Sequence, residues 1–168
     1  SLGHRRIGIT TGPLHLTTSR ARLAGYREAL ERAGITIDTH LICEGNYLLG
    51  DGIKQTYSLL DLPDPPTAIF TGNDAQAAGV YQALYQRSIH IPDEISVIGF
   101  DDVTYTAQMS PPLTTIHQPL VEMGRMATNM LLRLIAGFAL DSNHVELSTS
   151  LVIRDSCSTP RTRSLAGK

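Results

Sequence analysis

The first two thirds of the chain alternate short apolar runs with amphipathic stretches. Apolar runs rich in β-branched residues predict strands at 7–10, 37–43, 67–71 and 95–100. Apolar residues at helical spacing between them predict helices at 17–33, 53–60 and 73–87. Strands that are apolar almost throughout and separated by single helices are typical of a parallel sheet covered on both faces. The pattern therefore predicts an α/β fold.

The pattern changes after Phe100. Beyond it we expect, in order, an aperiodic stretch at 101–112, a short strand at 114–117, an amphipathic helix at 121–136, a β-rich piece at 145–154 and a flexible polar tail from Ser156. The helix has a strong apolar face rich in Met and Leu, so it needs a partner surface.

Composition favours one packed domain and argues against two classes of protein. The 168 residues are 42% hydrophobic and carry a net charge of -2, whereas a chain that grips DNA by itself usually has a concentrated positive excess. No apolar run approaches the roughly 18 residues of a membrane span, and no apolar signal-peptide centre follows the first basic residues. Cys43 and Cys157 are isolated, which suits a reducing compartment. We expect a cytoplasmic protein.

The motifs of most cofactor-dependent enzymes are absent from the sequence. It contains no GxGxxG after a strand, no GxxxxGK[ST] and no GxSxG. Its six histidines form no metal-ligand spacing with one another or with the cysteines. We therefore expect no cofactor, no metal site and no enzymatic activity.

Polar side chains follow the predicted strands where a ligand would bind. Thr18 and Arg22 open the helix after the first strand, Tyr47 follows the second, Asn73 the third and Asp101 the fourth. In open parallel sheets, ligands bind at the carboxyl ends of the strands. A carboxylate accepts from vicinal hydroxyls, a guanidinium donates as a planar fork, and a ring covers the apolar face of a sugar. The set suits a polyhydroxylated ligand.

Each of these residues also has a purely structural interpretation. Arg22 could be a solvated helix residue, and Asn73 could be only the N-cap of its helix. The pair Asp101-Asp102 could belong to a turn or form a general-acid pair, and Tyr47 could be a rim aromatic without a role. The residues alone leave these alternatives open.

Five ordered blocks of sequence carry a family resemblance. They are GPL at 12–14, SRARLAGY at 19–26, PTAIF at 66–70 together with ND at 73–74, DEISVIGFDD at 93–102, and PPLTTIHQ at 111–118, the most specific of all. Together they resemble the C-terminal half of the core of LacI/GalR transcriptional regulators. The resemblance covers roughly residues 3–155.

This resemblance implies a type I periplasmic-binding-protein-like core of two α/β subdomains with an effector in the cleft between them. Residues 4–116 and 151–155 would form the C-terminal subdomain, 117–150 would belong to the N-terminal subdomain, and 156–168 would be a flexible tail. The family's helix-turn-helix, its hinge helix and the first part of its N-terminal subdomain have no counterpart in the sequence. Operator DNA would be contacted only through that region. The helix at 121–136 would expose its apolar face.

The resemblance also assigns roles at a candidate effector site. Arg22, Asn73 and Asp101 match the family's polar effector ligands, whereas Thr18 and Tyr47 match further pocket-lining positions. Two more positions match the crossover between subdomains and the cleft wall beside it: Gln118 and Leu120. Leu120 departs from the aromatic ring of many relatives, which weakens the expected stacking on that wall.

We therefore expect the effector-binding part of a LacI-type regulator, a repressor or an activator, that responds to a sugar or a related small molecule. A secreted sugar-binding protein of a transporter is the alternative, and an enzyme that uses Asp101 or Asp102 with His117 is a third hypothesis. The family resemblance also implies a homodimer. Its candidate contacts, which could equally be ordinary core, are Ile89, Tyr105 and Met109.

Overall fold

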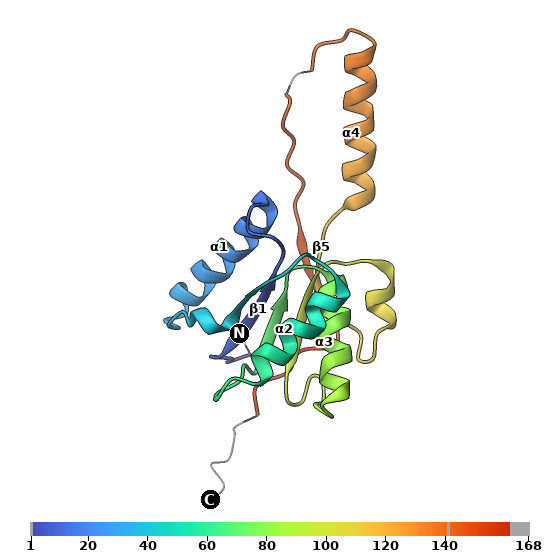
Figure 1. The fold of residues 1–168 in the computed structure, drawn as a ribbon. Coiled ribbons are helices and arrows are strands. Elements are labelled where there is room, and N and C mark those ends of the chain that lie inside the picture. The colour runs from blue at the N-terminus through green and yellow to red at the C-terminus, as the bar shows by residue number, and fades with distance from the viewer. Residues whose placement is uncertain (1, 141, 162–168) are drawn as a thin grey trace, which may run out of the picture.

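A computed structural model describes residues 2–140 and 142–161. The elements, in chain order, are β1 (Ile7–Thr11), α1 (Thr17–Arg32), β2 (Ile42–Glu44), α2 (Leu49–Leu60), β3 (Ala68–Thr71), α3 (Asp74–Gln86), β4 (Ser96–Asp101), β5 (Thr114–His117), α4 (Leu120–Ile135) and β6 (Ser150–Val152). They form one sheet of order β2-β1-β3-β4-β5-β6 (Figure 1). All neighbouring strands are parallel except β5 and β6, which are antiparallel. The predicted α/β fold is confirmed.

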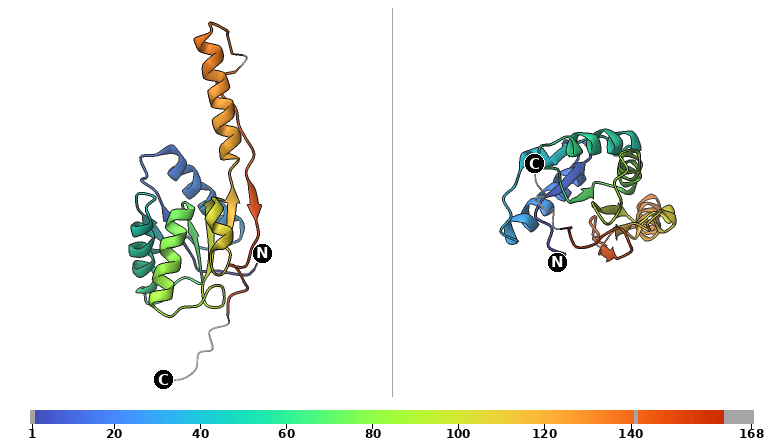
Figure 2. Two further views of the ribbon diagram at one scale, coloured as in Figure 1. Left: turned by 90° about the vertical axis from the view of Figure 1, so that its right-hand side faces the viewer. Right: turned by 90° about the horizontal axis from the view of Figure 1, so that it is seen from below.

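Helices cover the sheet on both faces because successive strand residues point to opposite sides. Ile9 of β1 packs with Leu23, Tyr26 and Leu30, which recur at helical spacing along α1. Ile69 of β3 instead belongs to a second core, which the side chains of α2 and α3 help to form. Seen from below, β1 and β3 lie between α1 on one side and the pair α2 and α3 on the other (Figure 2).

Two glycines let α2 and α3 approach closely. A Cβ atom added at Gly52 would lie 2.3 Å from the carbonyl oxygen of Gln76, and one at Gly79 would lie 2.1 Å from that of Leu49. Both distances are far shorter than a van der Waals contact allows. Glycine is therefore required where these two helices cross.

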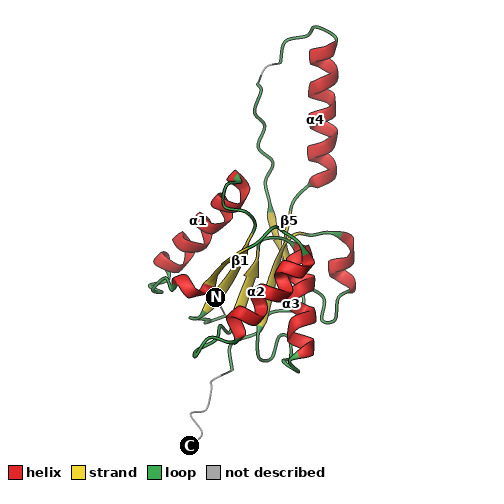
Figure 3. Ribbon diagram, viewed as in Figure 1, coloured by secondary structure: helices red, strands yellow, loops and turns green. Residues whose placement is uncertain are grey.

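The chain between β5 and β6 projects beyond the sheet as an arm, which we call the α4 arm and define as residues 118–140 and 142–149 (Figures 1 and 3). No residue of α4 is buried; Val121 is 87% exposed and Ile135 is 73% exposed. A groove of about 800 Å³ lies between α4 and the returning chain. The expectation that this helix exposes its apolar face is confirmed.

Two of the predicted strands are shorter in the structure. The strand expected at 37–43 begins only at Ile42, because a turn of 3-10 helix occupies Thr39–Leu41. That turn is capped by Asp38, whose carboxylate accepts a hydrogen bond of 3.0 Å from the backbone N–H of His40. The β-rich piece expected at 145–154 contributes only Ser150–Val152.

The flexible tail predicted from Ser156 is wrong for its first residues. Ser156 is fully buried; its hydroxyl donates to the carbonyl oxygen of Val97 at 2.6 Å and accepts from the backbone N–H of Thr114 at 2.8 Å. The backbone N–H of Ser158 donates to the hydroxyl of Ser96 at 3.0 Å. The Ser156 hydroxyl thus takes the place of a backbone partner between β4 and the start of β5. A hydropathy pattern does not predict such a side-chain bond. Residues 162–168 of the predicted tail lie outside the described residues.

Candidate functional site

The carboxyl ends of the parallel strands meet at one edge of the sheet, the edge from which the α4 arm leaves (Figure 1). The end of β4 and the loops and helices that follow the other strands bring five side chains together. We call them the strand-end cluster: Arg22, Tyr47, Phe100, Asp101 and Gln118. Three segments of sequence from the body and one from the base of the arm therefore converge here.

Arg22 is the centre of the cluster. Its guanidinium carbon lies 4.0 Å from the ring centroid of Phe100 and 5.5 Å from that of Tyr47. One guanidinium nitrogen also donates to the Tyr47 hydroxyl at 3.0 Å. The Arg22 side chain is only 16% exposed. Two aromatic faces therefore hold this cation in place, and the solvated interpretation of Arg22 is wrong.

Asp101 ends β4 beside this cation. Its carboxylate accepts a hydrogen bond of 2.6 Å from the side-chain amide of Gln118 and lies 3.8 Å from the guanidinium of Arg22. Burial raises the pKa of Asp101 and outweighs the opposing effects of Gln118 and Arg22. The backbone at Asp101 has φ +123°, a strained value for a residue other than glycine.

Tyr47 connects the loop after β2 to the start of α1. Its hydroxyl lies 2.8 Å from the hydroxyl of Ser19, which is fully buried, as well as against Arg22. Its ring covers the backbone of Gly12, where an added Cβ atom would approach within 2.0 Å. Tyr47 is therefore packed between Gly12, Ser19 and Arg22, and its contact with an effector stays a prediction. Ser19 and Phe100 were missed by the sequence analysis, although Ser19 lies one helical turn before Arg22.

Asn73 is the N-cap of α3, the structural role that its sequence position allowed. Its side-chain oxygen accepts from the backbone N–H of Gln76 at 2.9 Å, which makes it the N-cap of α3. Its side-chain nitrogen donates to the carbonyl oxygen of Tyr47 at 3.1 Å. In this structure Asn73 therefore fixes the Tyr47 loop while it caps α3.

Besides Asn73, two further predicted site residues lie outside the cluster. Thr18 is exposed in the first turn of α1, and Leu120 is 46% exposed at the start of α4. In the part of the chain that the structure describes, no hydrogen bond joins the Thr18 side chain to the cluster. The family resemblance assigned both residues to the site, and they remain predictions.

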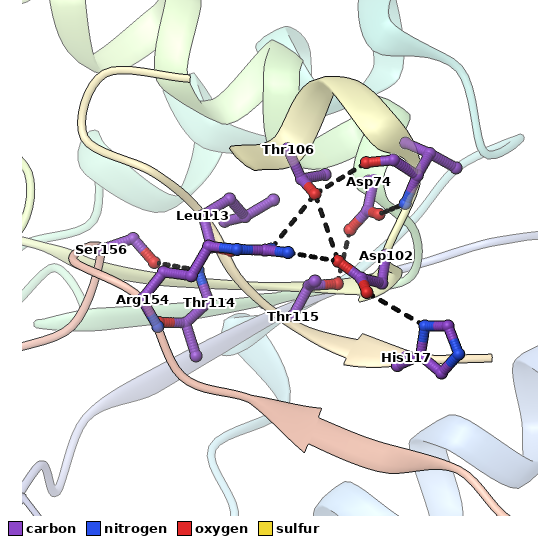
Figure 4. A network of polar contacts seen from close by, with 10 residues as sticks. Asp74, Asp102, Thr106, Leu113, Thr114, Thr115, His117, Arg154 and Ser156 are labelled. Atoms are coloured by element: carbon purple, nitrogen blue, oxygen red, sulfur yellow. Dashed lines mark hydrogen bonds and ion pairs between the residues drawn. The ribbon is translucent and has the colours of Figure 1, made fainter. Parts of the chain in front are cut away.

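A second polar network lies next to the cluster and contains Asp102 with His117, one of the two pairs that the enzyme hypothesis offers (Figure 4). His117 Nδ1 lies 3.0 Å from one oxygen of Asp102, and Arg154 donates to the other oxygen at 2.7 Å. Burial alone would raise the pKa of Asp102, but the hydrogen bonds and charges of Arg154 and His117 hold it below its usual range. A carboxylate with a lowered pKa is ionised at neutral pH, so Asp102 acts here as a hydrogen-bond acceptor and not as a proton donor.

Within residues 2–140 and 142–161, no three His, Cys, Asp or Glu side chains are grouped so that they could hold a metal ion. No helix in these ranges combines the length and the apolar character of a membrane span.

Comparison with known proteins gives consistent matches. Residues 1–157 match the family model of the periplasmic binding protein-like domain. The chain is 45% identical over 154 residues to the ribose operon repressor of Escherichia coli strain K12, a match that covers 92% of this chain and 47% of the repressor. The chain therefore spans about half the length of this relative.

Two solved structures share the fold. A sugar-binding transcriptional regulator of the LacI family from Escherichia coli, in complex with phosphate, gives a TM-score of 0.84 at 33% identity and covers 95% of this chain and 57% of the regulator. The transcriptional regulator CelR in complex with cellobiose gives a TM-score of 0.86 at 34% identity and covers 92% of this chain and 47% of CelR.

Proposed function

This chain belongs to the periplasmic binding protein-like family and to its LacI-type regulators, and on that premise we propose that it is part of the effector-binding core of a transcriptional regulator. Residues 4–116 with 151–155 form one subdomain, and 117–150 belong to the other. A small polyhydroxylated effector binds on the strand-end cluster, in the cleft between the two subdomains. The observation that carries this proposal is Arg22, fixed by two aromatic rings beside Asp101 at the carboxyl ends of the strands.

The chemistry of the cluster supports a sugar as the effector. Asp101 offers carboxylate oxygens to vicinal hydroxyls, and Arg22 offers N–H donors that are already held in one orientation. A preorganised donor loses little side-chain entropy when the ligand binds. The ring of Tyr47 supplies an apolar face for the carbon skeleton of the sugar. The ribose operon repressor is a relative, so D-ribose is the first effector to test.

The remaining predicted site residues complete this proposal. Asn73 reaches the effector by exchanging its bond to the Tyr47 carbonyl for one to a sugar hydroxyl. Gln118 follows β5 at the crossover and shares Asp101 with the effector, whereas Leu120 lines the wall of the cleft. Thr18 lies at the edge of the pocket, where a larger effector would contact it.

The mechanism that we propose is a difference in affinity between two arrangements of the subdomains. An effector that binds one arrangement more tightly shifts the population toward it, and this changes the affinity of the DNA-binding region for its operator. The other part of the second subdomain covers the apolar face of α4, which is bare in this chain. Contact with operator DNA belongs to a region outside these residues, since the chain has a net charge of -2.

A homodimer is part of the proposal, and its three candidate contact residues differ in how far they are buried. Ile89 and Met109 pack partly against the core formed with α2 and α3, whereas Tyr105 is 43% exposed. Tyr105 is therefore the best of the three as a contact between subunits. The relatives support this regulatory assignment over a secreted transport protein or an enzyme, because they are transcriptional repressors and regulators.

The test is release of promoter DNA by the full-length protein that contains this chain. We expect D-ribose to lower its affinity for the promoter of its own operon, and Asp101→Asn to require about 10- to 100-fold more D-ribose, because a hydrogen bond to a charged group contributes about 1.5–3 kcal/mol. Asp93→Asn, an exposed change at the far end of the sheet, is the control and should respond like the wild type. An unchanged response of Asp101→Asn would contradict the proposed site.

A further inference from the structure

One carboxylate bridges the two segments through which the chain leaves and re-enters the sheet. Asp102 Oδ2 lies 3.0 Å from Nδ1 of His117, and Asp102 Oδ1 accepts from Nη2 of Arg154 at 2.7 Å. The two contacts come from opposite sides of the carboxylate (Figure 4). The Arg154 and Asp102 side chains are 20% and 16% exposed, so water screens this ion pair less than one on an open surface, whereas the His117 side chain is 44% exposed.

The partners of Asp102 sit at the base of the α4 arm. His117 is the last residue of β5, where the chain departs toward α4, and Arg154 follows β6, where the chain returns. β5 and β6 pair directly, with His117 opposite Ser150. Arg154 also donates to the carbonyl oxygen of Leu113 at 2.7 Å. Asp102 thus holds both crossing segments where they leave the body.

Asp102 directly follows Asp101 of the strand-end cluster. Both have a positive φ, +123° at Asp101 and +59° at Asp102, so the chain turns sharply between the cluster and the bridge. On the other side of Asp102, the backbone N–H of Val103 donates to the buried carboxylate of Asp74 at 2.9 Å. The chain after Asp102 is therefore anchored to the first residue of α3.

We propose that Asp102 is a positioning residue that transmits effector binding at Asp101 to both crossing segments of the α4 arm. This inference rests on the proposed function for the identity of the effector site. Its physical content is a contiguous set of contacts from Asp101 through the Asp102 carboxylate to His117 on β5 and Arg154 after β6. Effector binding is thereby coupled to the segments that join the two subdomains.

The experiment is hydrogen exchange measured by mass spectrometry on the full-length protein, with D-ribose as the probe. Asp102→Asn removes the charge but keeps a residue that tolerates positive φ. We expect D-ribose to bind this variant within about threefold of the wild type, while the protection that D-ribose induces in the peptides covering 114–117 and 150–154 falls by at least about half. Asp101→Asn should instead lose affinity for D-ribose. Full D-ribose-induced protection in Asp102→Asn would overturn the proposal.

A second set of variants covers the case in which Asp102→Asn does not fold. Arg154→Lys keeps the charge and should retain part of the transmitted protection, whereas Arg154→Met should lose it. Equal protection in both would overturn the proposal.

Failure of the proposed function gives a different result. If D-ribose does not bind the wild type, the choice of effector fails. Hydrogen exchange without D-ribose then tests whether Asp102 holds both crossing segments. We then expect Asp102→Asn to speed exchange in both peptides, because its carboxylate contacts both segments. Faster exchange in one peptide only, or in neither, would overturn it.

Discussion

Two helices of similar length, α3 and α4, differ in how far their side chains are buried. α3 has 13 residues and buries seven of them against the sheet and α2, whereas α4 has 16 residues and buries none. Both have apolar residues at helical spacing. The hydrophobic pattern therefore identifies a helix and its apolar face, but it does not identify the surface that covers this face. For α4, no part of the described chain buries that face.

The largest contrast is expected between leucines on these two helices. Leu84 of α3 is fully buried, so Leu84→Ala should lower the free energy of unfolding by about 2–5 kcal/mol. Leu131 of α4 is 57% exposed, so Leu131→Ala should change it by about 0.5 kcal/mol or less. Urea unfolding of this chain measures both. Equal losses would show that α4 is covered in solution and would break the comparison.

A smaller effect is expected at the start of α3. Asn73→Ala removes the side-chain cap and should lower the free energy of unfolding by about 0.5–2 kcal/mol. It should also loosen the Tyr47 loop, because the Asn73 amide donates to the Tyr47 carbonyl. Asn73→Ser restores a capping oxygen but not the donated bond. A recovery of stability without a recovery of D-ribose affinity in the full-length protein would separate the two roles.

The smallest effect concerns the charge at Asp101. Burial raises the pKa of Asp101 in the folded protein, so its ionisation costs stability. This cost is absent below the usual carboxyl pKa of about 4 and develops as the pH rises through the raised folded value. Asp101→Asn should therefore gain about 0.5 kcal/mol or less over the wild type at neutral pH, and less in acid. Thermal unfolding of both proteins between about pH 4 and neutral pH checks the sign of this stability difference. A variant that is less stable than the wild type at neutral pH would contradict the prediction.

The sequence predicted the body of the molecule better than its edges. Continuous apolar strands and helical spacing identified the sheet and the helices on both faces, because these signals are local. The rule that ligands bind at strand ends brought Arg22, Tyr47 and Asp101 to one place, and the structure joins them.

Contacts between distant segments could not be predicted in the same way. Ser156 bonds to Val97, and Arg154 bonds to Asp102, across long separations in sequence that carry no periodic signal. Thr18 was placed by its position after a strand, and the structure leaves its side chain exposed. Side-chain direction at the end of a helix is set by packing, which a pattern of residue types does not contain.

The central claim is that Arg22 and the groups around it form the effector site of the α/β body. Calorimetric titration of D-ribose into the full-length protein tests it most directly. Arg22→Met should weaken binding by about 10- to 100-fold, whereas Arg27→Met, an exposed change further along α1, should bind like the wild type. Equal affinity in Arg22→Met and the wild type would contradict the account.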